Sequence, residues 1–137
     1  MELFKLPLPY EPKIKSRFIV KLPEYMGINE YFIKGGQRPK LDIINGEITP
    51  KPITITIADP IGPSSAQKIF DLIRDRTIEN EFTYSIELLG PIGDLVEKWE
   101  LYNCKIVGID FGELNYSNEG VMVITLTIQP KKVELLF

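Results

Sequence analysis

The chain has 137 residues, enough for one domain, with 44% hydrophobic residues, 26% charged residues and a net charge of −3. It contains no histidine and a single cysteine, Cys104, which excludes Ser-His-Asp, Cys-His and His-metal chemistry, an internal disulfide and a multi-thiolate zinc site. No basic run is present to neutralise phosphates, so we expect no tight nucleic-acid binding. Because histidine is absent, we also expect no catalysis, and no cofactor or metal.

The beginning of the chain, MELFKLPLPYEPK, does not resemble a signal peptide. An acid stands at position 2, and prolines interrupt the apolar run that a signal peptide needs. No window of the chain approaches the length of about 18 apolar residues that a membrane span requires. We therefore expect neither secretion by a signal peptide nor a membrane anchor.

Alternation of apolar and polar residues predicts five strands, each packed on one face and solvated on the other. In chain order these runs are RFIVKL (17–22), PITITIAD (52–59), FTYSIELL (82–89), KWELYNCKIVGIDF (98–111) and GVMVITLTIQP (120–130). In the last run, Met122, Ile124, Leu126 and Ile128 share the apolar face. The turn residues of GELNYSNEG predict that the last two runs form an antiparallel hairpin.

One amphipathic helix is predicted within PSSAQKIFDLIRDR, between the second and third strands. Ser64 and Gln67 have the spacing of a capping box at the helix N-terminus. The helical spacing i, i+3, i+4, i+7 predicts one buried stripe, made of Ala66, Ile69, Phe70 and Ile73.

The stretch IKGGQRPKLDIINGEITPKP (33–52) has no clear period and is long for a connection inside a compact domain. Loops of this length are usually functional or mobile, or they contain a hairpin. The dipeptide Asn45-Gly46 suits a type I′ turn between KLDII and EITPK. We expect one domain over residues 1–137, with an extended loop or hairpin arm at 33–52.

The triplet Asp110-Phe111-Gly112 matches the magnesium-binding triplet of protein kinases, but the other parts of a kinase site are missing. Its catalytic loop needs a histidine, and no glycine-rich phosphate loop is present. The triplet is therefore interpreted as the end of a strand followed by a bend. Carboxylates such as Glu79 and Glu81, or Asp94, Glu97 and Glu100, are interpreted as solvated charges rather than acid/base pairs.

Three segments in this order resemble the tail tube proteins of contractile-tailed bacteriophages: DPIGPSSAQKIFDLI, IELLGPIGDLVEKWELYNCKIVGIDFGELNYS and VMVITLTIQP. The shared pattern is an Asp-Pro turn before a single helix, a GPxGxxVExWEL-like segment, an Asp-Phe-Gly-x-Leu-x-Tyr turn and a final strand. The resemblance implies a mainly β fold: two packed antiparallel β-sheets, barrel- or sandwich-like, with one flanking α-helix.

The resemblance also implies a function. Six copies would close into a ring, and rings would stack into a tube inside a contractile sheath above a baseplate. DNA would leave through the lumen without specific binding, and the tube would belong to the tail of a virion assembled in the host cytoplasm. Related inner-tube proteins occur in type VI secretion and other contractile injection systems.

Several alternatives remain open at the level of the sequence. Within the same class, the chain could be a baseplate protein that starts the tube, or the inner tube of an injection system. A monomeric ligand-binding β-barrel is the alternative from another class; it needs an apolar cavity and predicts no self-assembly. An enzyme that uses carboxylates is the third.

Two sets of residues are candidates for the contacts of a tube subunit, one for the lumen and one for the adjacent ring. The polar strand faces supply candidates for the lumen: Thr54, Thr56, Thr83, Ser85, Glu87, Thr125 and Thr127. The arm supplies candidates for a grip on the adjacent ring: Arg38, Lys40, Leu41, Asp42, Ile43, Ile44 and Glu47.

Overall fold

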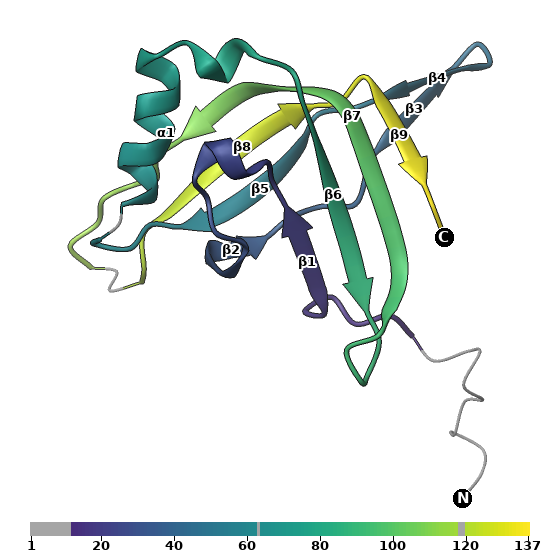
Figure 1. The fold of residues 1–137 in the computed structure, drawn as a ribbon, viewed down its shortest axis with the longest axis horizontal. Helices are drawn as coiled ribbons and strands as arrows, with labels where there is room; N and C mark the ends of the chain where they lie inside the picture. The colour runs from purple at the N-terminus through teal and green to yellow at the C-terminus, as the bar shows by residue number, and fades with distance from the viewer. Residues whose placement is uncertain (1–11, 63, 118–119) are drawn as a thin grey trace, which may run out of the picture.

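The computed structural model describes residues 12–62, 64–117 and 120–137. In this part of the chain the main elements are β1 (Phe18–Lys21), β2 (Ile33–Gly35), β3 (Leu41–Ile44), β4 (Glu47–Pro50), β5 (Ile53–Ala58), α1 (Ser65–Arg74), β6 (Phe82–Leu89), β7 (Leu95–Asp110), β8 (Val123–Gln129) and β9 (Lys132–Leu135) (Figure 1). Short 3-10 turns lie at Glu24–Met26, Glu30–Phe32 and Thr77–Glu79. None of the described helices is long and apolar enough to cross a membrane.

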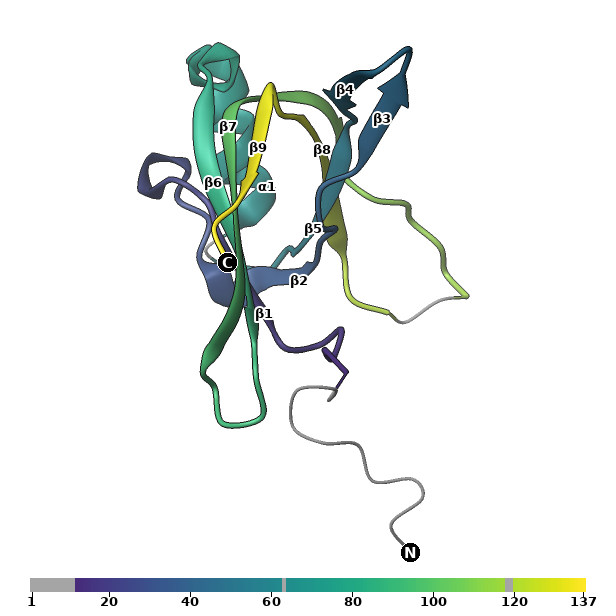
Figure 2. The same cartoon turned by 90° about the vertical axis from the view of Figure 1, so that its right-hand side faces the viewer.

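The main sheet curls into a nearly closed antiparallel barrel (Figure 2). Its strands follow the order β1-β6-β7-β8-β5-β2, and β9 adds to β7 outside this path. The strands β3 and β4 form a separate two-stranded sheet. The predicted mainly β, barrel-like class with one flanking helix is confirmed. Because β1 and β2 end the path, the barrel has one open seam between them.

Strand β7 joins the two walls of the barrel. Its first part pairs with β6 and β9, and its last part, from Lys105 to Asp110, pairs with β8. Asn103 has a positive φ of 52°, and the register shifts between Ile106 and Gly108, so the strand bends where it changes partners. The predicted hairpin between the last two long runs is confirmed as β7–β8.

The core is formed by the inward-facing side chains of the strands, which alternate with outward-facing ones, and by the buried side of α1. Its most buried members, at most 1% exposed, are Ile53, Ile55, Ile57, Ile69, Leu101, Cys104, Ile124, Leu126 and Ile128. Full burial stabilises each large side chain by about 1.5–3 kcal/mol. Met122, predicted to share this face, is 36% exposed because β8 begins only at Val123.

The helix α1 begins where its cap predicts, but it is rotated relative to the predicted stripe. The Ser64 hydroxyl accepts a hydrogen bond from the Gln67 amide at 3.2 Å. Ser65 Oγ donates to the Ala58 carbonyl at 3.1 Å, which fixes the helix against the end of β5. The buried residues of α1 are Ser65, Ile69 and Leu72. The predicted burial of Phe70 and Ile73 is wrong: they are 54% and 37% exposed.

Candidate assembly surfaces

The β3–β4 hairpin projects from the barrel (Figure 1). Its turn is Asn45-Gly46, with φ values of 51° and 83°, as a type I′ turn requires. At its base the Lys51 amide donates to the Lys40 carbonyl at 2.8 Å. Of the stretch 33–52, the first three residues form β2 and pair with β5. The projecting part is therefore the hairpin, from Leu41 to Pro50.

One face of this hairpin is apolar and uncovered. The register places Leu41 opposite Pro50 and Ile43 opposite Ile48, so these four side chains share a face. Ile43 is 72% exposed and Ile48 is 63% exposed. The other face carries Asp42, Ile44, Glu47 and Thr49. A strand pair this short is not stable by itself in water, so its apolar face is suited to contact with another molecule.

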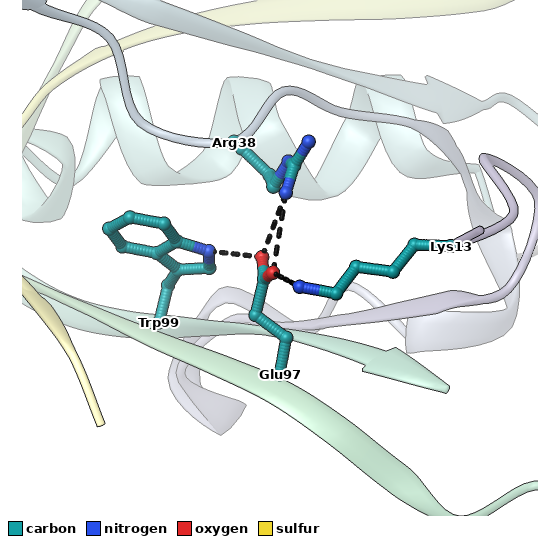
Figure 3. Close-up of polar contacts among 4 residues, drawn as sticks. All are labelled: Lys13, Arg38, Glu97 and Trp99. Atoms are coloured by element: carbon teal, nitrogen blue, oxygen red, sulfur yellow. Dashed lines mark hydrogen bonds and ion pairs between the residues drawn. The ribbon is translucent and has the colours of Figure 1, made fainter. Parts of the chain in front are cut away.

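Arg38 lies in the linker before the hairpin and binds Glu97, near the beginning of β7 (Figure 3). The Glu97 side chain is only 4% exposed. It accepts hydrogen bonds from Lys13 Nζ and Trp99 Nε1, both at 2.5 Å, and from Arg38 Nη1 at 3.3 Å. Burial by itself raises the pKa of Glu97, but the bonds from Lys13, Trp99 and Arg38 outweigh it and hold this pKa below its ordinary value.

The buried carboxylate ties three segments together: the chain entering β1, the linker entering the hairpin, and β7. The prediction that Glu97 is a solvated charge is therefore wrong, because its side chain is buried among three donors. The signal that was available is the spacing of Glu97 and Trp99, two residues apart, which places both side chains on the same side of a strand.

The predicted lumen residues fall into two groups. Thr54 lies opposite Thr127, and Thr56 lies opposite Thr125, so these four threonines share one outward face of β5 and β8. All four are half-buried, and the intervening isoleucines of β5 point into the core. Together they form a compact hydroxyl surface, referred to below as the threonine face.

The other group lies on β6, in the wall of the barrel across from β5 and β8 (Figure 2). Thr83 is exposed and Ser85 is half-buried. Glu87 is 7% exposed and forms ion pairs with Lys21 at 3.2 Å and with Lys98 at 3.7 Å. The structure does not bring this group together with the threonine face, and the two groups lie on different walls of the barrel.

Asp110-Phe111-Gly112 closes β7. The Asp110 carboxylate accepts a hydrogen bond from the Gly112 amide at 2.9 Å, which forms a local turn. Gly112 has a φ of +98°, and a Cβ there would lie 2.7 Å from the Val123 carbonyl oxygen. The turn thus accounts for the carboxylate at Asp110 and for the glycine at position 112. No cluster of three metal-ligating side chains occurs in residues 12–62, 64–117 and 120–137.

Three of the other groups considered for chemistry, Glu81, Glu100 and Cys104, are accounted for by the structure. Glu81 accepts hydrogen bonds from Lys131 Nζ at 2.7 Å and from Asn103 Nδ2 at 2.9 Å. The Tyr102 hydroxyl donates to Glu100 at 2.6 Å. Cys104 is 0% exposed, and burial raises the pKa of its thiol to about 12, which disfavours the nucleophilic thiolate.

Comparison with solved structures shows which proteins share this fold. A chain of the tube-terminating cap of the anti-feeding prophage is 15% identical, with a TM-score of 0.70 over 98% of both chains. A chain of the sheath-tube complex of an extracellular contractile injection system is 18% identical, with a TM-score of 0.66 over 93% of both chains. Hcp1 from Flavobacterium johnsoniae is 10% identical, with a TM-score of 0.52 over 87% of this chain and 94% of Hcp1.

No protein-family model and no curated protein matches the sequence. The structural matches span almost the whole chain, and they show that it has the fold found in chains of contractile injection systems and in Hcp. The resemblance to phage tail tube proteins is thus confirmed at the level of this wider fold.

Proposed function

We propose that this chain is a structural, non-enzymatic subunit that forms the tube of a contractile injection apparatus. The observation that carries the proposal is the near full-length correspondence with a chain of the tube-terminating cap, at a TM-score of 0.70. Glu81, Glu97 and Glu100 have structural partners and Cys104 is buried, which also favours a structural role.

The injection-system interpretation takes precedence over the more specific phage tail tube. The similar structures belong to the anti-feeding prophage, to an extracellular contractile injection system and to Hcp1. One similar chain comes from a baseplate and another from a cap, so a position at either end of a tube belongs to the same proposal. Sheath and baseplate proteins are the expected partners, and the location is the assembled apparatus.

In this proposal six copies close into a ring, and rings stack along the channel. The β3–β4 hairpin contacts the adjacent ring, because its apolar face is uncovered in the single subunit. The threonine face lines the lumen, since hydroxyl groups without cations let a polyanion such as DNA, or another cargo, pass without being held. Thr83, Ser85 and Glu87 lie on the wall across the barrel. We therefore leave them out of the proposed lining.

A monomeric ligand-binding barrel is the second candidate, and one observation favours it. The seam between β1 and β2 opens into a groove of about 740 Å³, which is large enough for a small ligand. This candidate predicts a chain that stays monomeric at every concentration.

The test is assembly of the purified protein. Light scattering coupled to size exclusion should show a species several times the 15.7 kDa subunit mass, growing with concentration, and negative-stain micrographs should show rings with a central hole. A strictly monomeric chain that forms no ring at any concentration contradicts the proposal and supports the ligand-binding barrel.

A further inference from the structure

The groove at the barrel seam has an apolar floor and a basic rim. Its floor is formed by side chains of β1, β2 and β6: Phe18, Val20, Ile33, Ile86 and Leu88. The basic residues at its rim are Lys13, Lys15, Lys34 and Arg38. Glu97 pairs with two of them, Lys13 and Arg38, and no other ion pair to the rim is formed within the described residues.

The groove lies between two strand edges that have no ladder partner within the described residues. Among the residues that the structure describes, β1 pairs with β6 alone and β2 with β5 alone. Gly36 approaches β1 closely, since a Cβ there would lie 3.6 Å from Val20 Cγ2. Uncovered strand edges promote aggregation, and proteins commonly cover them with another segment of chain.

The segment that directly precedes the groove has the pattern to fill it. In MELFKLPLPYE (1–11), large apolar residues recur at every second position: Phe4, Leu6, Leu8 and Tyr10. This is the pattern of an extended chain with one apolar face. Its acidic residues, Glu2 and Glu11, complement the basic rim of the groove.

The prolines of this segment restrict how it can pair. Backbone groups of successive residues in an extended chain point to opposite sides, so Pro7 and Pro9 remove amide donors from one side only. If the segment is extended, the amides of Leu6, Leu8 and Tyr10 would be on the other side and could pair with one strand edge. Proline is tolerated in edge strands for this reason.

Glu97 fixes the point from which the segment leaves the barrel. Its bond to Lys13 Nζ holds the chain at the rim of the groove, two residues after the segment ends (Figure 3). Eleven extended residues reach about 36 Å, and the four residues of β1 span only about 13 Å. The segment is therefore long enough to turn back along the whole groove.

We propose that residues 1–11 of the same chain occupy the seam groove as an extended segment. The apolar residues Phe4, Leu6 and Leu8 cover the floor, and one side of the segment pairs with a free strand edge. In this arrangement the segment would cover the seam between β1 and β2. This inference concerns the single subunit and does not depend on ring assembly.

The test is hydrogen exchange of the full-length protein, followed by mass spectrometry. Amides of residues 2–11 should exchange at least tenfold more slowly than in a free peptide of the same sequence. Gly36→Leu fills the groove without backbone strain, and it should raise these rates at least fivefold. Gly62→Leu is the control, since a Cβ at Gly62 meets no atom within 4 Å, and it should leave the rates unchanged.

A second set of variants protects the test against misfolding of Gly36→Leu. The triple variant Phe4→Ser, Leu6→Ser, Leu8→Ser should release the segment and raise exchange in residues 16–21 and 33–37. The variant Lys5→Gln keeps the apolar face and both acidic residues, and it should change these rates less than twofold.

Three results would overturn the proposal. Free-peptide exchange of residues 2–11 in the parent protein would show that the segment is not docked. Protection that survives both Gly36→Leu and the serine variant would place it outside the groove, and protection that disappears on dilution would assign it to another copy. A monomeric chain with a protected segment would refute the tube but not this inference, so the two failures are distinguishable.

Discussion

Replacing the apolar cross-strand pair of the hairpin, Ile43→Ser together with Ile48→Ser, should prevent assembly of tubes and leave the subunit folded. The two side chains lie opposite each other on the uncovered face of β3 and β4. They contact little of their own subunit, with 72% and 63% of their surfaces exposed. The account assigns the remaining surface to a neighbouring ring.

The magnitude follows from these exposures. Full burial of an isoleucine is worth about 1.5–3 kcal/mol, and about a third of each side chain is covered in the subunit. Each substitution should therefore lower the free energy of unfolding of the subunit by at most about 1 kcal/mol. If a neighbouring ring covers the rest of the side chain, each substitution should weaken the contact between rings by about 1–2 kcal/mol. Summed over two residues and six copies, stacking of a ring is weakened by roughly 12–24 kcal/mol, enough to abolish tubes.

The assay combines a denaturation midpoint of the subunit with micrographs of the assembled protein. The matched control is Asp42→Ser with Thr49→Ser, the cross-strand pair on the opposite face of the same hairpin. We expect the isoleucine variant to fold and to lose tubes, and the control to keep both. Tubes of normal length in the isoleucine variant would refute the stacking role of the apolar face.

The other predictions concern the subunit. Ile69→Ala should cost about 2–5 kcal/mol in chemical denaturation and Phe70→Ala less than about 1.5 kcal/mol, since their exposed fractions are 1% and 54%; equal costs would contradict the observed rotation of α1. Glu97→Gln should destabilise by about 1–3 kcal/mol. Because the pKa of Glu97 is lowered in the folded protein, its carboxylate stabilises the fold fully above the unfolded pKa near 4.5, and this stabilisation is lost as the pH falls through the folded pKa. The cost of Glu97→Gln should therefore shrink in melts at acid pH. A cost that does not change with pH would refute the role of the buried carboxylate. Asp110→Asn should leave calorimetric titrations with magnesium and ATP flat, as in the parent; a magnesium-dependent signal in the parent would contradict the turn assignment.

The strands could be predicted from the sequence because each one is half-buried. The alternation in 82–89 predicts β6 to the residue, and that in 52–59 predicts β5 to within one residue at each end. The strand β9 has no comparable pattern, since Lys132, Glu134 and Leu135 are all exposed and only its pairing with β7 defines it.

The rotation of the helix could not be predicted from its period. Ile69 belongs both to the predicted stripe and to the observed one, and spacing alone does not choose between Phe70 and Leu72 as its companion. In the structure Ser65, on the buried side of α1, donates to the Ala58 carbonyl, and such a contact between separate elements is not visible in the helical period.

The candidate assembly surfaces also depend on contacts that the sequence pattern does not predict. The threonines of β5 and β8 share a face because the two strands are neighbours in register. The strand β7 lies between β6 and β8 in the sheet, so the polar residues of β6 lie on another wall of the barrel. Glu97 differs from a solvated carboxylate only through donors 84 and 59 residues away in the chain, Lys13 and Arg38. Such contacts between distant residues have no local signature.

The central claim is that copies of this chain form a tube whose lumen is lined by β5 and β8. Electron cryomicroscopy of the assembled protein tests it most directly. The account predicts six-fold rings in which Thr54, Thr56, Thr125 and Thr127 face the channel and each hairpin contacts the next ring. Only monomers at high concentration, or rings that turn the threonine face away from the channel, would contradict it.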